Sequence, residues 1–423
     1  MRTPRTVAAG LSGTLLAGLL SAAPALAPAS AQPTPTPVPA PVSPGGAIQP
    51  GANLPVPDWV KPGVRLTYYT GSRSADSGRG GNLVRNPNGT IEDDQGNKYS
   101  WAKDVGGPST GNSAGHGYTV HDILEVNHGR VTVRTVNYLV AGALGQTTPN
   151  AMSASTTVYD AATGGGAWMH PQVLQQRTGK FSGPYQTITG QDYQAIILGD
   201  KQHHQTYDVR SGLLLGELLV SEGTIGNTVG PDGSIHPRSR SNAAVVSFIS
   251  FRQLDPAMVT PGELPPIVRP GLKLNYQGGI GMSQAIGGFN TPPSPFTVEL
   301  TVDRVDQGVA HCNIVSAFPG MGAPPARESK TAMAYGSYWA PTAMLQGLRT
   351  GQVLDQDATL MTRTVVQHAG PDPQGRDIVT LHSANRVFES YQTFDRKTGL
   401  VLDALLVNHE TNQYTRVTLQ NPG

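Results

Sequence analysis

Cysteine is almost absent from the chain: Cys312 is the only one in 423 residues. A disulfide within the chain is therefore excluded, and so is a zinc or redox site made of paired cysteines. Cys312 alternates with Ala310 and Ile314 on an apolar strand face, whereas His311 points to the opposite face. The pattern predicts a buried and unreactive thiol.

Charge is also scarce, since charged residues make up 14% of the chain. Thirty Lys and Arg stand against 29 Asp and Glu, which leaves a formal net charge of +1. A chain so nearly neutral has no basic field to hold nucleic acid or an anionic membrane surface. Nothing in the sequence indicates a cofactor or a bound metal, and it does not identify a protein partner.

Long apolar runs are missing too. The main one extends from Val7 to Leu20, which is too short to span a bilayer, so we expect no transmembrane segment in the mature chain. It follows Arg2 and Arg5 and precedes two small-residue motifs that end at Ala27 and Ala31. Residues 1–31 are thus predicted to be a signal peptide, cleaved after Ala27 or Ala31, that exports the protein to the periplasm or beyond the cell. A membrane anchor is the alternative interpretation.

Glycine and proline are abundant, at 51 and 35 residues, and favour many short strands joined by turns. Residues 32–57 are rich in proline and predict an extended linker without a core. The length of the chain suits two or three domains with a sizeable core.

One stretch occurs twice: HHQTYDVRSGLLLGELLV at residues 203–220 returns as SYQTFDRKTGLVLDALLV at residues 390–407. The two align without a gap and predict a strand, a tight turn and a second strand. Asp208 and Asp395 can accept hydrogen bonds from backbone N–H groups of the turn, and Gly212 and Gly399 supply the positive φ that ends it.

The flanking segments repeat in the same order. PGVRLTY matches PGLKLNY, and a short helix expected near Trp168 to Gln176 has its counterpart after Trp339. We predict a mainly β protein with two tandem repeats, each a curved antiparallel sheet wrapped on one short helix like a half-barrel. The predicted repeats cover residues 58–255, with an inserted Gly/Ser/Asn-rich loop at 71–117, and residues 267–423, with a linker at 256–266. Two separate sheets and one fused sheet are both possible.

This layout resembles the half-barrel of periplasmic lipoprotein carriers and related envelope lipid-binding proteins. The resemblance depends on the strand order and on the hairpin motif, present as Tyr207-Asp208 with Ser211-Gly212-Leu213 and as Phe394-Asp395 with Thr398-Gly399-Leu400. It implies an apolar cavity between sheet and helix that could hold an acyl chain. The duplication and the long inserted loop are departures from such carriers.

The leading hypothesis is an exported, non-enzymatic protein that binds a lipid or another apolar or amphiphilic molecule between each sheet and its helix. The candidate ligand-binding residues are Leu66, Tyr68, Asp122, Leu174, Leu215, Leu274, Tyr276, Phe289, Leu345 and Leu402. Asp122 falls on the strand face of Tyr118 and Val120, where a carboxylate is costly unless paired or hydrated. Either a polar pocket opens there or a bulge turns Asp122 outward.

A second segment could border the same ligand space. The loop at residues 277–295 is rich in glycine yet carries Ile280, Met282, Ile286 and Phe289. It is either a flap over a cavity, or a contact surface for a partner, or a segment whose apolar side chains pack on the neighbouring sheet.

Signals for chemistry are weak. Ser113 lies in a G-x-S-x-G pattern, but a nucleophile elbow needs a strand before it and a helix after it. His203 and His204 are adjacent on a strand and point to opposite faces, so they cannot both join one metal site. Asp355 and Asp357 share a strand face without a calcium-loop pattern. The alternatives to ligand binding are therefore an envelope structural or adhesion module with a filled core and, third, a hydrolase that uses Ser113.

Overall fold

The computed structural model describes residues 56–77, 84–85, 90–92, 98–100, 116–140, 148–177, 181–199, 203–229, 235–282, 293–319 and 324–422. Residues 1–55, and with them the predicted signal peptide and most of the predicted linker, lie outside the described residues. Ser113, Ile286 and Phe289 do as well.

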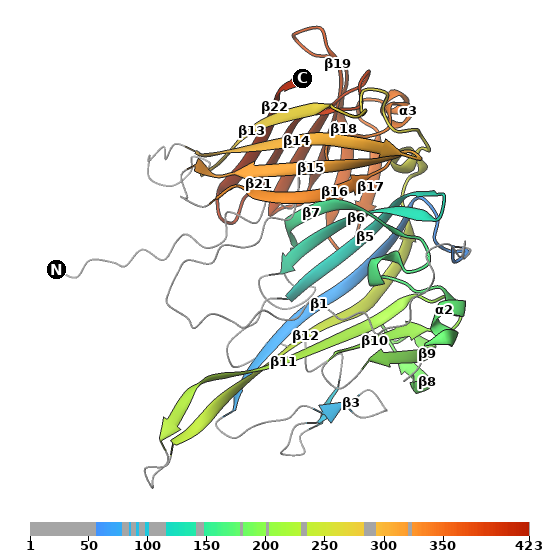
Figure 1. Cartoon of the computed structure of the whole chain (residues 1–423), viewed down its shortest axis with the longest axis vertical. Coiled ribbons are helices and arrows are strands. Elements are labelled where there is room, and N and C mark those ends of the chain that lie inside the picture. Colours follow the sequence, from blue (N-terminus) through green and yellow to red (C-terminus); the bar gives the residue numbers. More distant parts are fainter. Residues whose placement is uncertain are drawn as a thin grey trace, which may run out of the picture.

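The first sheet has nine strands in the order β7-β6-β5-β1-β12-β11-β10-β9-β8. Every neighbouring pair is antiparallel. In Figure 1 the long strands β11 and β12 extend well beyond the others as a hairpin. The strands are β1 (Val64–Ser77), β5 (His116–Asn127), β6 (Arg130–Val140), β7 (Asn150–Asp160), β8 (Phe181–Gln186), β9 (Asp192–Gly199), β10 (His203–Asp208), β11 (Leu214–Val229) and β12 (Ile235–Gln253).

The second sheet has ten antiparallel strands in the order β16-β15-β14-β13-β22-β21-β20-β19-β18-β17. It is built from β13 (Lys273–Met282), β14 (Ser294–Asp306), β15 (Val309–Ala317), β16 (Ala326–Ala332), β17 (Val353–Asp357), β18 (Thr362–Pro371), β19 (Asp377–Ala384), β20 (Phe388–Asp395), β21 (Val401–Asn408) and β22 (Gln413–Pro422).

The two strand orders are the same apart from β17, which has no counterpart among the described residues of the first repeat. β1 corresponds to β13, the hairpin β10–β11 to β20–β21, and the closing strand β12 to β22. The predicted fold class is thus confirmed, and the two sheets are separate rather than fused. Their edge strands β7 and β16 lie side by side in Figure 1 without a hydrogen-bond ladder between them.

The repeated hairpin forms as the sequence predicts. An Asp208 carboxylate oxygen accepts from the Ser211 N–H at 2.8 Å, and Asp395 Oδ1 accepts from the Lys397 and Thr398 N–H groups at 2.9 and 2.7 Å. Gly212 and Gly399 have φ values of 73° and 77°. Each glycine also passes directly beside a carbonyl, that of Met169 or of Ala340, so that a side chain is excluded on two grounds.

A tryptophan and a short helix pack beside each hairpin. Trp168 and Trp339 form equivalent bridges to Leu213 and Leu400, and each indole N–H donates to a carbonyl a few residues earlier. Helix α2 (Pro171–Gln176) starts after His170, with proline in its first turn, and helix α3 (Thr342–Gly347) follows Pro341. Short 3₁₀ turns, η1 (Gly164–Gly166) and η2 (Pro256–Val259), complete the connections.

Each repeat has its own apolar core under its helix. The first core surrounds Trp168 and Leu174, and the second surrounds Trp339 and Leu345, all of which are completely or almost completely buried. Two smaller clusters lie between the repeats, because Leu360 packs with Tyr118 and Val120, and Phe388 packs against Tyr138. Apolar burial of this kind is the main favourable term in folding.

The predicted inserted loop contributes a small separate sheet, β2 (Val84–Arg85), β3 (Thr90–Glu92) and β4 (Lys98–Ser100), in the order β2-β3-β4. Its antiparallel pairs flank the NPNG and DDQGN segments, which the sequence predicts as hairpin turns. The turn residues themselves lie outside the described part of the chain.

Candidate functional site

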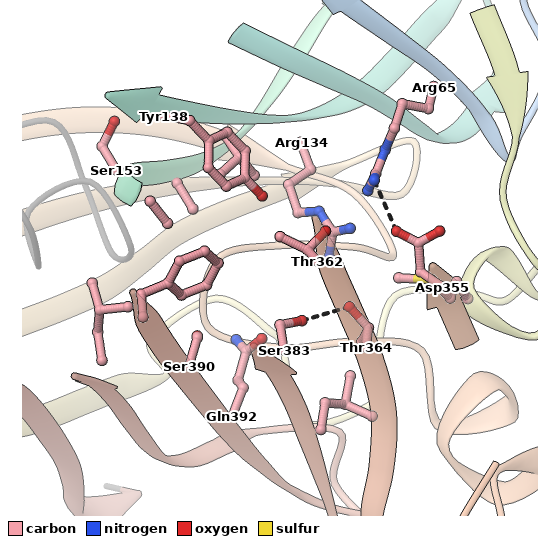
Figure 2. A pocket seen from close by; sticks show the side chains of 17 residues that line it. Arg65, Arg134, Tyr138, Ser153, Asp355, Thr362, Thr364, Ser383, Ser390 and Gln392 are labelled. Carbon is pink, nitrogen blue, oxygen red and sulfur yellow. Dashed lines mark hydrogen bonds and ion pairs between the residues drawn. The ribbon is translucent and has the colours of Figure 1, made fainter. Parts of the chain in front are cut away.

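A cavity of about 130 Å³ lies between the repeats. Its floor is the inner face of the second sheet, from β18 to β21, and its roof is formed by β6 and β7 of the first sheet (Figure 2). The floor is the same sheet face that packs on α3 further along, since Val366, Val379 and Phe394 each lie two residues from a cavity residue on the same strand and so share its face. The cavity is thus the part of this half-barrel that the helix leaves open.

The cavity has an apolar end and a polar end. Its apolar lining comes from both repeats: Val136, Ala151, Ala154, Met258, Leu381, Phe388 and Leu406. A row of hydroxyl groups crosses the floor, because Thr364, Ser383 and Ser390 are register neighbours on three strands. Thr364 and Ser383 hydrogen-bond to each other at 2.6 Å. The mixture of surfaces suits a molecule with both apolar and hydrogen-bonding parts.

Tyr138 reaches into the cavity from β6 and is tilted against Phe388, with ring centroids 6.1 Å apart. Burial raises the pKa of Tyr138 to about 12, so its hydroxyl keeps its proton at any physiological pH. It can therefore donate a hydrogen bond to a bound molecule.

The polar end is a cluster of six charged side chains, of which four are buried and two, Arg134 and Arg252, are partly exposed. Arg65, Arg134 and Arg252 come from β1, β6 and β12 of the first sheet, Asp122 comes from β5, and Asp355 and Asp357 come from β17 of the second sheet. Arg65 lies at the centre, since it contacts all three carboxylates. The guanidinium of Arg252 completes the link to the second sheet, with Nη2 2.6 Å from Asp355 and Nε 3.1 Å from Asp357.

The cluster is electrically balanced, with three guanidinium groups and three carboxylates. Asp122 is fully buried, and its two oxygens are taken up by Arg65 and by Arg134, the latter at 2.6 Å. Burial by itself raises the pKa of Asp122, but the two guanidinium charges and their hydrogen bonds outweigh it and hold the pKa far below its usual value. The carboxylate thus stays ionised and paired.

Asp122 shows why the sequence left two interpretations open. The Asp122 carboxylate is buried, but it points toward the second repeat. His121 is opposite Leu66, which lies in the first core, so Asp122, the next residue along the strand, points to the other side of the sheet. A register shift does follow, between Ile123 and Glu125. The shift places Leu124 in the core of the second repeat.

Seven of the other candidate ligand residues lie in the two cores rather than in the cavity. Leu66, Tyr68, Leu174 and Leu215 are fully buried in the first core, and Leu274, Tyr276 and Leu345 are buried in the second. Leu402 is half-buried on β21. The hypothesis that these residues contact a ligand stays a prediction, since none of them lines the cavity between the sheets.

The sequence does not predict most of the residues that line the cavity. Val136, Ser383 and Phe388 lie on β6, β19 and β20, and they line a cavity that exists only where the two repeats meet. Asp355 and Asp357 carried the one available signal: two carboxylates on the same strand face in a chain poor in charge, which require cationic partners if that face is buried.

The remaining candidates are placed as follows. Cys312 is buried as predicted, and burial raises the pKa of its thiol to about 12. His203 pairs with Glu217 at 2.6 Å, and His204 is buried. Ile280 packs against the second core, whereas Met282 is exposed. Within the described ranges, no three His, Cys, Asp or Glu side chains converge to hold a metal ion, and no helix has the length and apolar character needed to cross a membrane.

Comparison with known proteins gives little. No family model matches the chain, and no curated protein matches it. Among solved structures, the chain is similar to the "Crystal structure of MucB in complex with MucA(peri)", with a TM-score of 0.18 and 11% sequence identity. The match covers 84% of this chain and 88% of that one.

Proposed function

We propose that the protein is an exported, non-enzymatic binding protein whose ligand is a small amphiphilic molecule held in the cavity between the two repeats. The observation that carries the proposal is the lining of this cavity, where the apolar side chains of Phe388 and Leu406 lie beside a row of hydroxyl groups on the same sheet face. Export is supported by the charged, apolar and small-residue pattern of residues 1–31.

The size of the cavity limits the ligand. A volume of about 130 Å³ is close to that of the engineered apolar cavity of about 150 Å³ that binds benzene, so one ring or a short alkyl segment fits. The apolar part would contact Phe388, Leu406 and Val136, and the polar part would reach Tyr138, Ser383 or Ser390. The guanidinium of Arg134, which is about one-third exposed, borders the same space.

Titration calorimetry with a short-chain fatty acid and with a neutral alkyl glucoside, both below their micelle concentrations, tests the proposal. Ser390→Phe places a ring in the cavity and is expected to weaken binding at least tenfold. Thr393→Phe is the matched control, because Thr393 lies on the same strand and faces the other side of the sheet. Equal binding by both variants, or no binding of either probe by the natural chain, would count against the proposal.

A second candidate function has an observation of its own. The space between each sheet and its helix is filled by side chains such as Leu174 and Leu345, which have no exposed surface. A structural or adhesion module requires only such filled cores and no ligand-binding cavity. Native mass spectrometry separates the two candidates, because a purified chain of bare polypeptide mass that releases no small molecule on extraction favours the structural role.

A further inference from the structure

A second cavity, of about 150 Å³, lies where two hairpin turns of different repeats meet. One turn joins β5 to β6 and the other joins β14 to β15. The lining residues are Asn127, His128 and Arg130 from the first hairpin, Arg304, Asp306, Gln307, Val309 and His311 from the second, and Met333 after β16. We refer to this cavity as the turn cleft.

The two turns occupy equivalent places in the duplicated fold and have the same backbone shape. His128 and Gly129 have φ values of 46° and 73°, and Gln307 and Gly308 have 48° and 76°. Two successive positive φ angles are the geometry of the tightest hairpin turns, which glycine and asparagine prefer. Residues other than glycine are uncommon at positive φ, yet here the side chains of His128 and Gln307 both border the turn cleft.

The charge in the turn cleft is unbalanced, in contrast with the buried cluster at the first cavity. Arg130 and Arg304 are permanently positive, His128 and His311 add ring N–H groups, and Asp306 is the one acidic residue in the lining. Asp306 is already shared, since its Oδ2 is 3.2 Å from Arg304 Nε and 3.7 Å from His311 Nε2. For Arg130, the described residues provide no carboxylate partner.

The pair of Arg304 and Asp306 is weak enough to open. Both side chains are more than half exposed, and an exposed ion pair contributes about 0–1 kcal/mol. Glu125 lies close by, but its carboxylate is bound by the backbone N–H groups of Ala334 and Tyr335 and by Asn127. Burial also raises the pKa of Glu125. Glu125 does not line the turn cleft.

From this arrangement we propose that the turn cleft binds a phosphate group, held by Arg130 and Arg304 as the two guanidinium arms. Two planar forks from two different hairpins can share the several oxygens of one phosphate. Such charge-assisted hydrogen bonds are the strong ones. The ring N–H groups of His128 and His311 supply further donors. The site is separate from the cavity between the sheets and does not depend on the function proposed above.

The phosphate can belong to a soluble molecule or to a lipid headgroup, and two probes distinguish these sources. Methyl phosphate is titrated into the full chain by calorimetry, and vesicles of phosphatidylcholine with and without phosphatidic acid are tested by co-sedimentation. Binding of methyl phosphate supports a soluble ligand, and binding of the acidic vesicles alone supports a headgroup.

The variant Arg130→Gln/Arg304→Gln is expected to weaken binding of the effective probe at least tenfold. Arg416→Gln is the matched control, because Arg416 is an exposed arginine in an ion pair on β22, with Asp403, and does not line the turn cleft. Arg130→Lys/Arg304→Lys, which keeps the charge and removes the forks, is expected to lose part of the affinity and guards against a folding defect. Failure of both probes to bind the natural chain, or equal binding by the Gln variant and the control, overturns the proposal.

Discussion

At the scale of single residues, His121 connects folding to pH. Its ring packs edge-on against Tyr68 with centroids 5.6 Å apart, and its Nδ1 is 2.9 Å from the Thr135 hydroxyl. Burial lowers the pKa of His121 from 6.5 to about 4, and the nearby Asp122 offsets part of this effect. The folded chain therefore keeps the ring neutral, whereas the unfolded chain takes up a proton below pH 6.5.

The neutral ring of His121 makes the folded state less stable in acid. Between pH 6.5 and pH 4 the unfolded state binds more protons at this position, so this part of the stability falls as the pH falls. Relative to pH 7.5, the contribution of His121 at pH 5 is a loss of about 2 kcal/mol. His121→Asn should remove that part of the pH dependence. Urea unfolding of both chains at the two pH values measures it, and parallel pH profiles would show that the ring does not titrate this way.

Some residue-scale features were predictable and others were not. The alternation of Ala310, Cys312 and Ile314 is sufficient to predict a buried thiol, because an apolar strand face is buried whichever residues cover it. The partners of Asp122 were not predictable in the same way. Arg65 is 57 residues away from Asp122 and 290 residues away from Asp355, and no pattern within one strand specifies contacts at such separations.

At the scale of elements, the repeated hairpin needs its glycine for two reasons that can be separated. Gly399 has a φ of 77°, and a Cβ added there would lie 2.4 Å from the Ala340 carbonyl oxygen. Gly375, in the turn between β18 and β19, has nearly the same φ of 76° but open space around it. The comparison isolates the close approach of the two backbones from the positive φ.

Gly375→Ala is expected to cost about 1–2 kcal/mol of unfolding free energy, which is the cost of placing a side chain in the left-handed region. Gly399→Ala is expected to cost about 2 kcal/mol more, because the hairpin must also move away from the segment that leads into α3. Urea unfolding of both variants gives the difference. Equal losses of unfolding free energy in the two variants would mean that the segment leading into α3 moves away from the hairpin at no energetic cost.

Elements were the most predictable level. The Asp-x-x-(Ser/Thr)-Gly turn, the strand alternation and the helix after Trp168 each depend on neighbours within about ten residues, and all of them form. The short strand β17 was not predicted as an addition to the second sheet. It contributes a strand of five residues whose role, two carboxylates for the other repeat, appears only in the assembled molecule.

At the scale of the whole molecule, the six-membered ion cluster joins the two repeats. Asp355→Asn/Asp357→Asn leaves the buried Arg65 and the partly exposed Arg252 with too little negative charge. Breaking a buried pair from one side costs about 3–5 kcal/mol. We expect this variant to lose about 3 kcal/mol of unfolding free energy and to unfold in two steps, one for each repeat. Calorimetry and urea unfolding report both effects.

Asp403→Asn is the control for that variant, since Asp403 pairs with the exposed Arg416 and its loss should cost about 0–1 kcal/mol. A stability loss in the Asp355→Asn/Asp357→Asn variant no larger than in the control would mean that the repeats are held together mainly by the apolar contacts of Leu360 and Phe388.

The arrangement of the two repeats relative to each other cannot be predicted from the sequence. Local patterns define each sheet, and the duplication defines their likeness, but the first cavity and the turn cleft both arise from surfaces that meet across the repeat boundary. The candidate ligand residues were therefore sought within single repeats, beside the helices, where the structure has packed cores.

The added strand β17 has a consequence for how the two halves diverged. The exposed Lys273 occupies the position of Arg65 in the second copy. Thr301 occupies that of Asp122, since it is opposite Lys273 as Asp122 is opposite Arg65. A protein made of two first halves would lack the carboxylates that pair with Arg65 and Arg252. A protein made of two second halves would lack the guanidinium groups that pair with the carboxylates of β17. With these differences neither copy can replace the other, so the gene has to encode two different halves.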